Sequence, residues 1–289
     1  MSIHIRKLRA GLGAEIGGIN LSEPVDERGL QLIRRALDEH GVLALPNQPI
    51  DDDAHVRFAR GFGTLQTFRP RKEPGGLPPE IFRSSNADDA GNIRAPSADD
   101  IKLLKLNWLW HADTCYRAVP SRGVVLRAVE MVSAGGDTVF ANNTASYEAL
   151  PEALQRRIAG LSVLHSFEFL VRTQDVPPLS PEEMGRLPRA IHPLVRRHPD
   201  GRKSLFLSPP YMESVVGWDR SASRALFEEL LAVATQERFL YRHKWAPDDV
   251  LVWNNEWTMH HVTPFDAGSE RRTMHGATIV GTSAFGGSE

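Results

Sequence analysis

Residues 107–113 place an imidazole and a carboxylate two positions apart, at His111 and Asp113, within a run rich in leucine and tryptophan. In an extended strand, side chains at positions i and i+2 point to the same face. His111 and Asp113 could therefore bind one metal ion from one wall of a pocket. Two histidines and one carboxylate that leave coordination positions open are typical of non-haem iron(II) oxygenases. This interpretation needs a second histidine from elsewhere in the chain.

The His-x-Asp spacing is not specific by itself, because a hydrogen-bonded pair without a metal has the same pattern. The chain contains a second such pair, His198 and Asp200, within a His-Pro-Asp-Gly sequence. Pro-Asp-Gly is characteristic of a turn, so we expect that pair on the surface. The context of the first pair must therefore decide its role.

A strand-like run that ends at Trp253 is followed by His260 and His261, either of which could complete the ligand set. Two arginines, Arg271 and Arg272, come shortly afterwards. Iron(II) activates O2 only with additional electrons, and 2-oxoglutarate can supply two of them by oxidative decarboxylation. The distal carboxylate of 2-oxoglutarate needs a cation, and a guanidinium offers a bidentate fork. The order of these residues therefore points to an oxygenase that uses 2-oxoglutarate.

The composition excludes several classes of function. The 289 residues can bury a substantial core, as one large domain or two ordinary ones. The net charge of −2 gives no electrostatic case for binding nucleic acid or a membrane surface, and no apolar run approaches the length of a membrane span. The single cysteine, Cys115, excludes an internal disulfide and fits a reducing compartment, so we expect a cytoplasmic protein.

Hydrophobic spacing predicts several amphipathic helices and many short strands. We expect helices at 26–40, 51–62, 148–161 and 221–235. We expect strands at 42–45, 124–132, 137–141, 238–242, 250–253 and 271–281. This pattern favours a β core with helices packed outside it. Residues 68–101 are rich in Pro, Gly, Asp and Ser, which predicts a mobile lid, and a loop insertion is expected around residues 165–195.

Four stretches resemble the taurine and 2,4-dichlorophenoxyacetate dioxygenase family of iron(II)/2-oxoglutarate enzymes, and they occur in family order. These stretches are residues 13–19, 109–113, 135–138 and 271–279. The resemblance covers nearly the whole chain and implies a single domain over residues 1–289. It implies a mixed α+β fold with a double-stranded β-helix core (a jelly roll, cupin-like) and flanking helices. It also implies iron(II), 2-oxoglutarate and O2, a small-molecule substrate, and a homodimer or homotetramer.

The resemblance also assigns roles to individual residues. The residues that correspond to the iron ligands are His111, Asp113 and His260. The residues that fall where the family holds the distal carboxylate of 2-oxoglutarate are Thr138 and Arg272. The loop between the last histidine and the arginine pair is one residue longer than is usual in the family. His261 as the ligand and Arg271 as the anchor therefore stay open as alternatives.

Several departures from the family describe the substrate pocket. Taurine and phenoxyacetate enzymes carry an arginine for the substrate's acidic group where this chain has Gly276, which removes a cation and opens space. Phe68 replaces a polar substrate contact, Tyr211 aligns with an aromatic pocket residue, and Asn107 is a further candidate contact. These residues predict a roomy pocket for a substrate with an aromatic or apolar body. Carboxylic acids and aryl ethers are among the candidates, and taurine is not expected.

Four arginines in the expected lid are solvated charges by default, and any one of them could supply the cation missing at Gly276. They are Arg69, Arg71, Arg83 and Arg94. Asn254 replaces the aspartate of the family's common Trp-Asp-Asn run, and no feature of the sequence explains that change.

Two alternative functions use the same residues. A zinc hydrolase also needs three protein ligands and an open position, but it has no need of Thr138 and Arg272. A catalytically silent binding protein could keep the scaffold, but it would not need an intact ligand set. A metal-to-ligand charge-transfer band on anaerobic addition of iron(II) and 2-oxoglutarate distinguishes the oxygenase from both.

Overall fold

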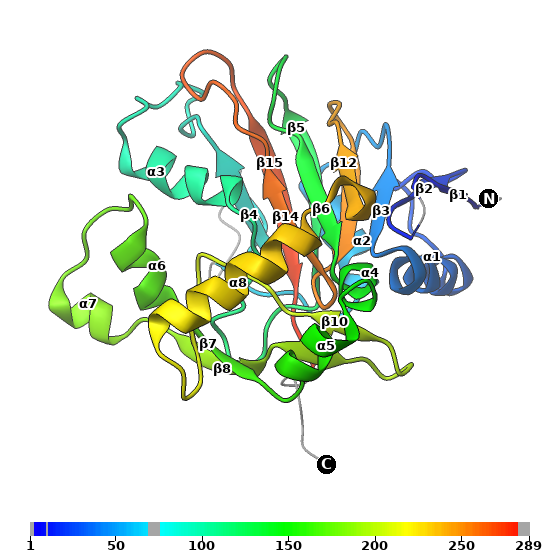
Figure 1. Cartoon of the computed structure of the whole chain (residues 1–289). Helices are drawn as coiled ribbons and strands as arrows, with labels where there is room; N and C mark the ends of the chain where they lie inside the picture. Colours follow the sequence, from blue (N-terminus) through cyan, green and yellow to red (C-terminus); the bar gives the residue numbers. More distant parts are fainter. Residues whose placement is uncertain (1–2, 10, 69–75, 283–289) are drawn as a thin grey trace.

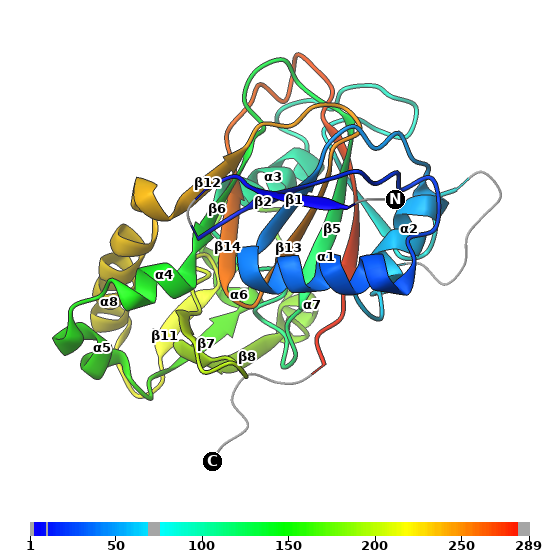
Figure 2. The same cartoon turned by 90° about the vertical axis from the view of Figure 1, so that its right-hand side faces the viewer.

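The computed structural model describes residues 3–9, 11–68 and 76–282 of the chain. At its centre two β-sheets face each other, and their inner side chains pack together (Figures 1 and 2). Phe140 of the smaller sheet contacts Trp253 of the larger one, with ring centroids 5.6 Å apart. The two sheets with helices outside them confirm the mixed α+β jelly roll predicted from the sequence.

The larger sheet has seven strands in the order β1-β2-β3-β13-β5-β15-β4. Only β2 and β3 run parallel among these neighbours. The strands are β1 His4–Lys7, β2 Ala14–Gly17, β3 Val42–Leu45, β13 Val250–Asn254, β5 Gly123–Glu130, β15 Thr273–Ile279 and β4 Ile81–Ser85. Val125 of β5 pairs with both Val252 and Ala277. Segments from the middle and the end of the chain thus share one sheet, which is how distant residues reach a common site.

The smaller sheet has the order β12-β6-β14 and lies across the core from the larger one. Its strands are β12 Leu240–His243, β6 Thr138–Asn142 and β14 Thr258–Val262. A short 3-10 helix, η2 Glu237–Phe239, leads into β12. An isolated antiparallel bridge joins His111 to His260 of β14. This bridge draws the His-x-Asp segment to the edge of the smaller sheet.

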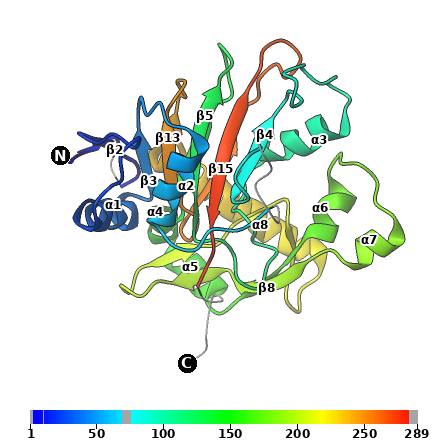
Figure 3. The ribbon, with the colours of Figure 1, turned by 180° about the vertical axis from the view of Figure 1, so that it is seen from behind.

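Two helices cover the outer face of the larger sheet, α1 Glu27–His40 and α2 Asp52–Arg60 (Figure 3). Each begins after an aspartate whose carboxylate accepts a backbone N–H of the first turn, Asp26 at 2.7 Å and Asp51 at 2.8 Å. Such caps satisfy donors that a helix end leaves unpaired. Ile33 of α1 is fully buried against this sheet. The two helices therefore cover much of the outer face of the larger sheet.

A second group of elements covers the smaller sheet. Its apolar cluster joins Leu226 and Leu230 of α8 to Met259 of β14. The helices are α4 Asn143–Glu148, α5 Glu152–Ile158 and α8 Arg220–Ala234. The strands form a sheet β11-β7-β8 and a hairpin β10-β9, with bounds β7 Ser162–Ser166, β8 Arg189–Pro193, β11 Met212–Val215, β9 Val195–Arg197 and β10 Lys203–Leu205.

Two expected elements differ from the structure. The helix predicted at 148–161 is divided, because Pro151 lacks a backbone N–H and precedes α5 instead of continuing α4. The insertion expected around 165–195 is not a plain loop. It contains α6 Phe167–Thr173, α7 Pro181–Gly185 and β8.

The region predicted as a lid also contains regular structure. Its described part holds β4 and the first residues of α3 Asp99–Lys105, while residues 69–75, with Arg69 and Arg71, lie outside the described residues. The lid's mobility and the boundary of a single domain therefore stay predictions. Within the described ranges, no helix combines the length and apolarity needed to cross a bilayer.

Candidate active site

His111, Asp113 and His260 converge, and their candidate ligand atoms all lie within 4.8 Å of one another. Nε2 of His111 is 3.8 Å from Oδ1 of Asp113, and Nε2 of His260 is 3.9 Å from Oδ2 of the same carboxylate. Both histidines are buried. Two imidazole nitrogens and one carboxylate in this arrangement can bind a single divalent metal ion.

The backbone explains why His260 rather than His261 joins the group. His111 and His260 each donate a backbone N–H to the other's carbonyl at 2.9 Å, and their rings lie 4.3 Å apart. Successive side chains of β14 point to opposite faces, so His261 packs instead against Trp110, at 4.3 Å. The extended strand expected at 111–113 is only this bridge followed by a turn. Asp113 nevertheless reaches the same site as His111.

Hydrogen bonding and burial set the protonation of the donor atoms. Nδ1–H of His111 donates to the carbonyl of Leu109 at 2.7 Å, and this bond leaves the lone pair on Nε2. Burial lowers the pKa of His260 well below its ordinary value, so this imidazole is neutral near neutral pH. Burial also raises the pKa of the Asp113 carboxyl. A cation bound here would favour the charged carboxylate, so the donor set suits a metal ion.

Trp253 and Asn255 hold Asp113 in place through hydrogen bonds. Neither residue was predicted to belong to the site. Nε1–H of Trp253 donates to Oδ2 of Asp113 at 3.2 Å. Oδ1 of Asn255 accepts the N–H of Asp113 at 2.8 Å, and its Nδ2 donates to the carbonyl of Asp113 at 2.9 Å. The available signal was the Trp-x-Asn spacing just before the histidines. Asn254 has a local role, because its Oδ1 accepts the N–H of Glu256 at 2.9 Å, a bond that aspartate could also make.

Arg272 is a buried cation that makes no ion pair within the described residues, although the charge of Asp137 acts on it from a distance. Only 3% of the residue is exposed, and its Nε and Nη2 donate to the carbonyl of Gly136 at 3.3 and 3.0 Å. Within the described part of the chain, no carboxylate forms an ion pair with it. Burial lowers its pKa to about 10, so it remains charged near neutral pH and favours an anionic ligand. Arg271 is instead half exposed and pairs with Glu130 at 3.0 Å.

Thr138 lines the same cavity as Arg272. Its Oγ1 accepts Nε1–H of Trp245 at 2.9 Å, and the O–H of the threonine can still donate to another group. The two side chains therefore offer a hydroxyl and a guanidinium to an anion bound in this cavity.

The triad opens into a cavity of about 1890 Å³. Other predicted site residues that line it are Thr138, Arg272, Asn107 and Phe68. Asn107 belongs to the 3-10 helix η1 Leu106–Trp108, directly after α3. Tyr211 lines an adjoining cavity of about 130 Å³, which also touches Asn107, His111 and Asp113. The larger volume exceeds the roughly 300–1,000 Å³ of an ordinary ligand site, so it has room for a substrate and a co-substrate together.

The position of Gly276 is closed by a neighbouring ring. A Cβ at Gly276 would lie 2.2 Å from Cζ of Phe82, the residue paired with it on β4. The expectation that Gly276 opens space is therefore wrong, although the glycine does remove a cation. Phe82 and Phe68 meet edge to face with centroids 5.5 Å apart, and both line the cavity. This wall is aromatic.

We expect Gly276→Ala to destabilise the fold, because a methyl group there collides with the ring of Phe82. Overpacking of this kind costs about 1–3 kcal/mol, which should lower Tm by roughly 2–12 °C in a chain of this size. Thermal unfolding followed by circular dichroism measures the shift. The matched control is Gly185→Ala, since a Cβ there meets no atom within 4 Å. Equal melting temperatures for the two variants would contradict this packing.

Comparison with known proteins finds relatives that cover nearly the whole chain. Residues 4–278 match the model of the family described as taurine catabolism dioxygenase TauD, TfdA family. The chain is 31% identical to the (S)-phenoxypropionate/alpha-ketoglutarate-dioxygenase of Sphingobium herbicidovorans, over 97% of this chain and 96% of that protein. It is 32% identical to the alpha-ketoglutarate-dependent 2,4-dichlorophenoxyacetate dioxygenase of Cupriavidus pinatubonensis, over 97% and 98% of the two chains.

A solved structure shares the fold from end to end. The crystal structure of AAD-2 in complex with Mn(II) and N-oxalylglycine superposes with a TM-score of 0.90 at 29% identity, and the match covers 100% of both chains. N-oxalylglycine is an analogue of 2-oxoglutarate, so that protein binds a divalent metal and a keto-acid mimic on the same fold.

Proposed function

The chain belongs to the TauD/TfdA family, and from that premise we propose that it hydroxylates an aryl-ether carboxylic acid or a similar small molecule with an aromatic body. As its relatives are, the chain is an iron(II)- and 2-oxoglutarate-dependent dioxygenase that acts on a small organic molecule. One observation carries the proposal: the buried donor set of His111, Asp113 and His260 shares a cavity with the buried, unpaired guanidinium of Arg272.

The residues present fit both the metal and the keto acid. His111, Asp113 and His260 would hold iron(II), since their donors are two nitrogens and one carboxylate within 4.8 Å. Arg272 and Thr138 would hold the distal carboxylate of 2-oxoglutarate, because an anion stabilises a buried cation that no described carboxylate contacts directly. A zinc hydrolase would not need the carboxylate-binding pair of Arg272 and Thr138. A catalytically silent binding protein would not need the three metal ligands.

In the proposed mechanism, the chain positions the reactants and excludes water. Bound iron(II) and 2-oxoglutarate supply the O2 activation that hydroxylates a C–H bond, with succinate and CO2 as the other products. Trp253 and Asn255 keep Asp113 oriented through hydrogen bonds. Apolar side chains of both sheets, among them Val124 and Val262, line part of the cavity and would displace water from a bound substrate. Hydroxylation of the carbon next to an ether oxygen yields a hemiacetal, whose collapse cleaves the ether.

The substrate class is proposed from the cavity wall and the relatives. Phe68 and Phe82 present an aromatic surface, which suits an aromatic ring better than a short alkyl sulfonate. Two relatives are named for phenoxypropionate and 2,4-dichlorophenoxyacetate, both aryl-ether acids. Gly276 carries no cation for a sulfonate, so taurine should be a poor substrate. Asn107 lines both cavities and Tyr211 the smaller one, so both would contact a substrate that reaches past the triad.

A charge-transfer experiment tests the proposed function. Anaerobic addition of iron(II) and 2-oxoglutarate should give a visible metal-to-ligand charge-transfer band in the wild type and none in His111→Ala. A panel of aryloxy acids, N-acyl amino acids, sulfonates and aromatic acids is then scored by succinate release. Aryloxy acids should stimulate the most succinate. A wild type without the band, or one that prefers taurine, would contradict the proposal.

We also propose a cytoplasmic homo-oligomer, a dimer or a tetramer. The single cysteine, Cys115, is free and buried, which fits a reducing compartment. Light scattering coupled to gel filtration measures the mass of the assembly, and a monomer at micromolar concentration would contradict this part.

A further inference from the structure

Few side chains that are always positively charged line the cavity, and they differ in the groups to which they are hydrogen-bonded. The basic side chains other than histidine that line it, among the described residues, are Arg83, Arg94, Arg117 and Arg272. Gly276 contributes no cation, and an acidic substrate held away from water needs one. Arg272 serves 2-oxoglutarate in the proposed function. The remaining arginines, Arg83, Arg94 and Arg117, are the possible partners of an acidic group on the substrate.

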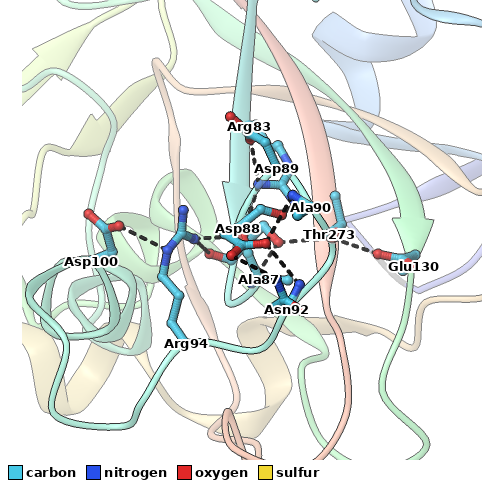
Figure 4. A network of polar contacts seen from close by, with 11 residues as sticks. Arg83, Ala87, Asp88, Asp89, Ala90, Asn92, Arg94, Asp100, Glu130 and Thr273 are labelled. Carbon is cyan, nitrogen blue, oxygen red and sulfur yellow. Dashed lines mark hydrogen bonds and ion pairs between the residues drawn. The ribbon is translucent and has the colours of Figure 1, made fainter.

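Arg94 is committed to the loop between β4 and α3 (Figure 4). Its Nη1 donates to the carbonyl of Ala87 at 2.6 Å and lies 3.4 Å from that of Ser85. Its Nε is 3.0 Å from a carboxylate oxygen of Asp100. This guanidinium holds the loop together and is already neutralised.

Arg83 lines the cavity from the outer face of the sheet and is bound to the same loop. It donates to the carbonyls of Ala87 and Asp88 at 2.9 and 3.1 Å, and Figure 4 shows it turned toward Asp89. Side chains alternate along β4. Phe82 faces the core between the two sheets, so its neighbour Arg83 faces outward, and its Cα partner on β15 is His275. Neither lid arginine in the described residues is free for a substrate.

Arg117 differs from these two. Within the described ranges, its side chain makes one hydrogen bond, from Nη1 to Oε1 of Gln66 at 3.0 Å, and no ion pair. Gln66 donates its backbone N–H to the carbonyl of Thr278, which places Arg117 near the last residues of β15. Arg272 precedes the first residue of that strand. Thr278 comes six positions after Arg272, roughly 20 Å along a strand, so the two arginines are associated with opposite ends of β15.

The backbone beneath Arg117 is well fixed. The chain turns immediately after Asp113, where Thr114 has a φ of 53°, a left-handed value that β-branched residues rarely adopt. The N–H of Arg117 donates to the carbonyl of Thr114 at 2.9 Å. The carbonyl of Arg117 accepts from Nε2 of His192 at 3.0 Å. A fixed backbone lowers the entropic cost of ordering this side chain on a ligand.

We propose that Arg117 is the substrate anchor of this enzyme and replaces the cation that is missing at position 276. Its guanidinium binds the oxyanion of the substrate, a carboxylate or a sulfate, through charged hydrogen bonds. Gln66 and Phe68 both line the cavity, so the aromatic wall adjoins the anchor and receives the apolar body of the substrate. This inference rests on the proposed function, since it names the group that the dioxygenase recognises.

The test compares Arg117→Gln with the wild type on substrates with and without the acidic group. The pairs are phenoxyacetate with phenoxyacetamide, and hexyl sulfate with 1-hexanol. We expect the KM of the preferred acid to rise roughly 10-fold, near the lower end of the worth of a hydrogen bond to a charged group, because Arg117 is exposed and water screens part of the attraction. Its kcat should change little, because an anchor binds ground and transition states alike. The neutral compounds should be unaffected, and Arg117→Lys should recover part of the loss.

Two controls separate this proposal from the proposed function. Arg224→Gln removes an exposed arginine on α8 that pairs with Glu228 and should leave every KM unchanged. The charge-transfer band with iron(II) and 2-oxoglutarate should be as strong in Arg117→Gln as in the wild type. An acid preference that survives Arg117→Gln, or a wild type without any acid preference, overturns the anchor alone. A wild type with neither band nor succinate overturns the proposed function and the anchor with it.

Discussion

Replacing His260 with alanine should abolish tight binding of iron(II) and the oxidation of any substrate, whereas His261→Ala should leave both nearly intact. His260 offers Nε2 to the group that contains Asp113, at 3.9 Å from its carboxylate. Residues that merely orient a metal ligand cost about 10- to 100-fold in affinity or activity when they are removed. Loss of a ligand itself should therefore exceed about 100-fold. The charge-transfer band under anaerobic titration with iron(II), and succinate release in air, measure the two effects.

His261 makes a demanding control because it is adjacent in the chain and has the same side chain. Its ring packs against Trp110, so its truncation removes one aromatic contact and no candidate metal ligand. Melting temperatures of the two metal-free variants should be recorded, so that a folding defect is not mistaken for a lost ligand. The assignment is wrong if His261→Ala loses the band and His260→Ala keeps it.

Replacing Arg272 with alanine should weaken 2-oxoglutarate binding by roughly 100-fold or more, while Arg271→Ala should change it little. Each hydrogen bond to a charged group contributes about 1.5–3 kcal/mol, and two such bonds to one carboxylate account for a change of this size. The guanidinium is buried, so water screens this attraction only weakly. Arg271 is half exposed and already neutralised by Glu130. Titration of the charge-transfer band with 2-oxoglutarate at fixed iron(II) gives both dissociation constants.

Arg272→Lys refines this result, because lysine keeps the charge but loses the planar fork. It should bind 2-oxoglutarate more tightly than the alanine variant and less tightly than the wild type. Iron(II) binding without 2-oxoglutarate, followed by competition with a chromophoric chelator, should be the same in all these variants. Similar affinities for 2-oxoglutarate in Arg272→Ala and Arg271→Ala would show that the anion is held elsewhere.

The fold class and the third ligand were predicted through the resemblance to a known family, whereas the first two ligands were visible in short-range spacing alone. His111 and Asp113 are two residues apart, and one bridge and one turn suffice to bring them together. The choice between His260 and His261 was open in the sequence. It depends on the register of β14 against β6, where His260 lies opposite Phe140. The register of a strand is set by how its side chains pack on the rest of the protein. The residues around His260 and His261 do not by themselves reveal that packing.

Other parts of the site depend on contacts between distant segments and could not be read from the sequence. Gly276 was expected to leave an open space, but the residue that fills it, Phe82, comes from a strand nearly two hundred positions earlier. Asn255 acts through the backbone of Asp113, so the Trp-x-Asn spacing can mark this asparagine but cannot identify its partner. Arg83 and Arg94 of the expected lid looked available to a substrate, and only their hydrogen-bond partners show that they are committed to the loop. Arg117 lies outside that region, and no sequence pattern marked it.

The ring that lies over Gly276 also constrains how positions 82 and 276 can change. A long basic side chain introduced at position 276 would meet Phe82, and a shortened side chain at position 82 would lose packing against the core. Each substitution alone should lower stability, whereas the two together relieve the collision, so we expect sign epistasis between the two positions. Variants selected for new substrates should therefore change other walls of the pocket first.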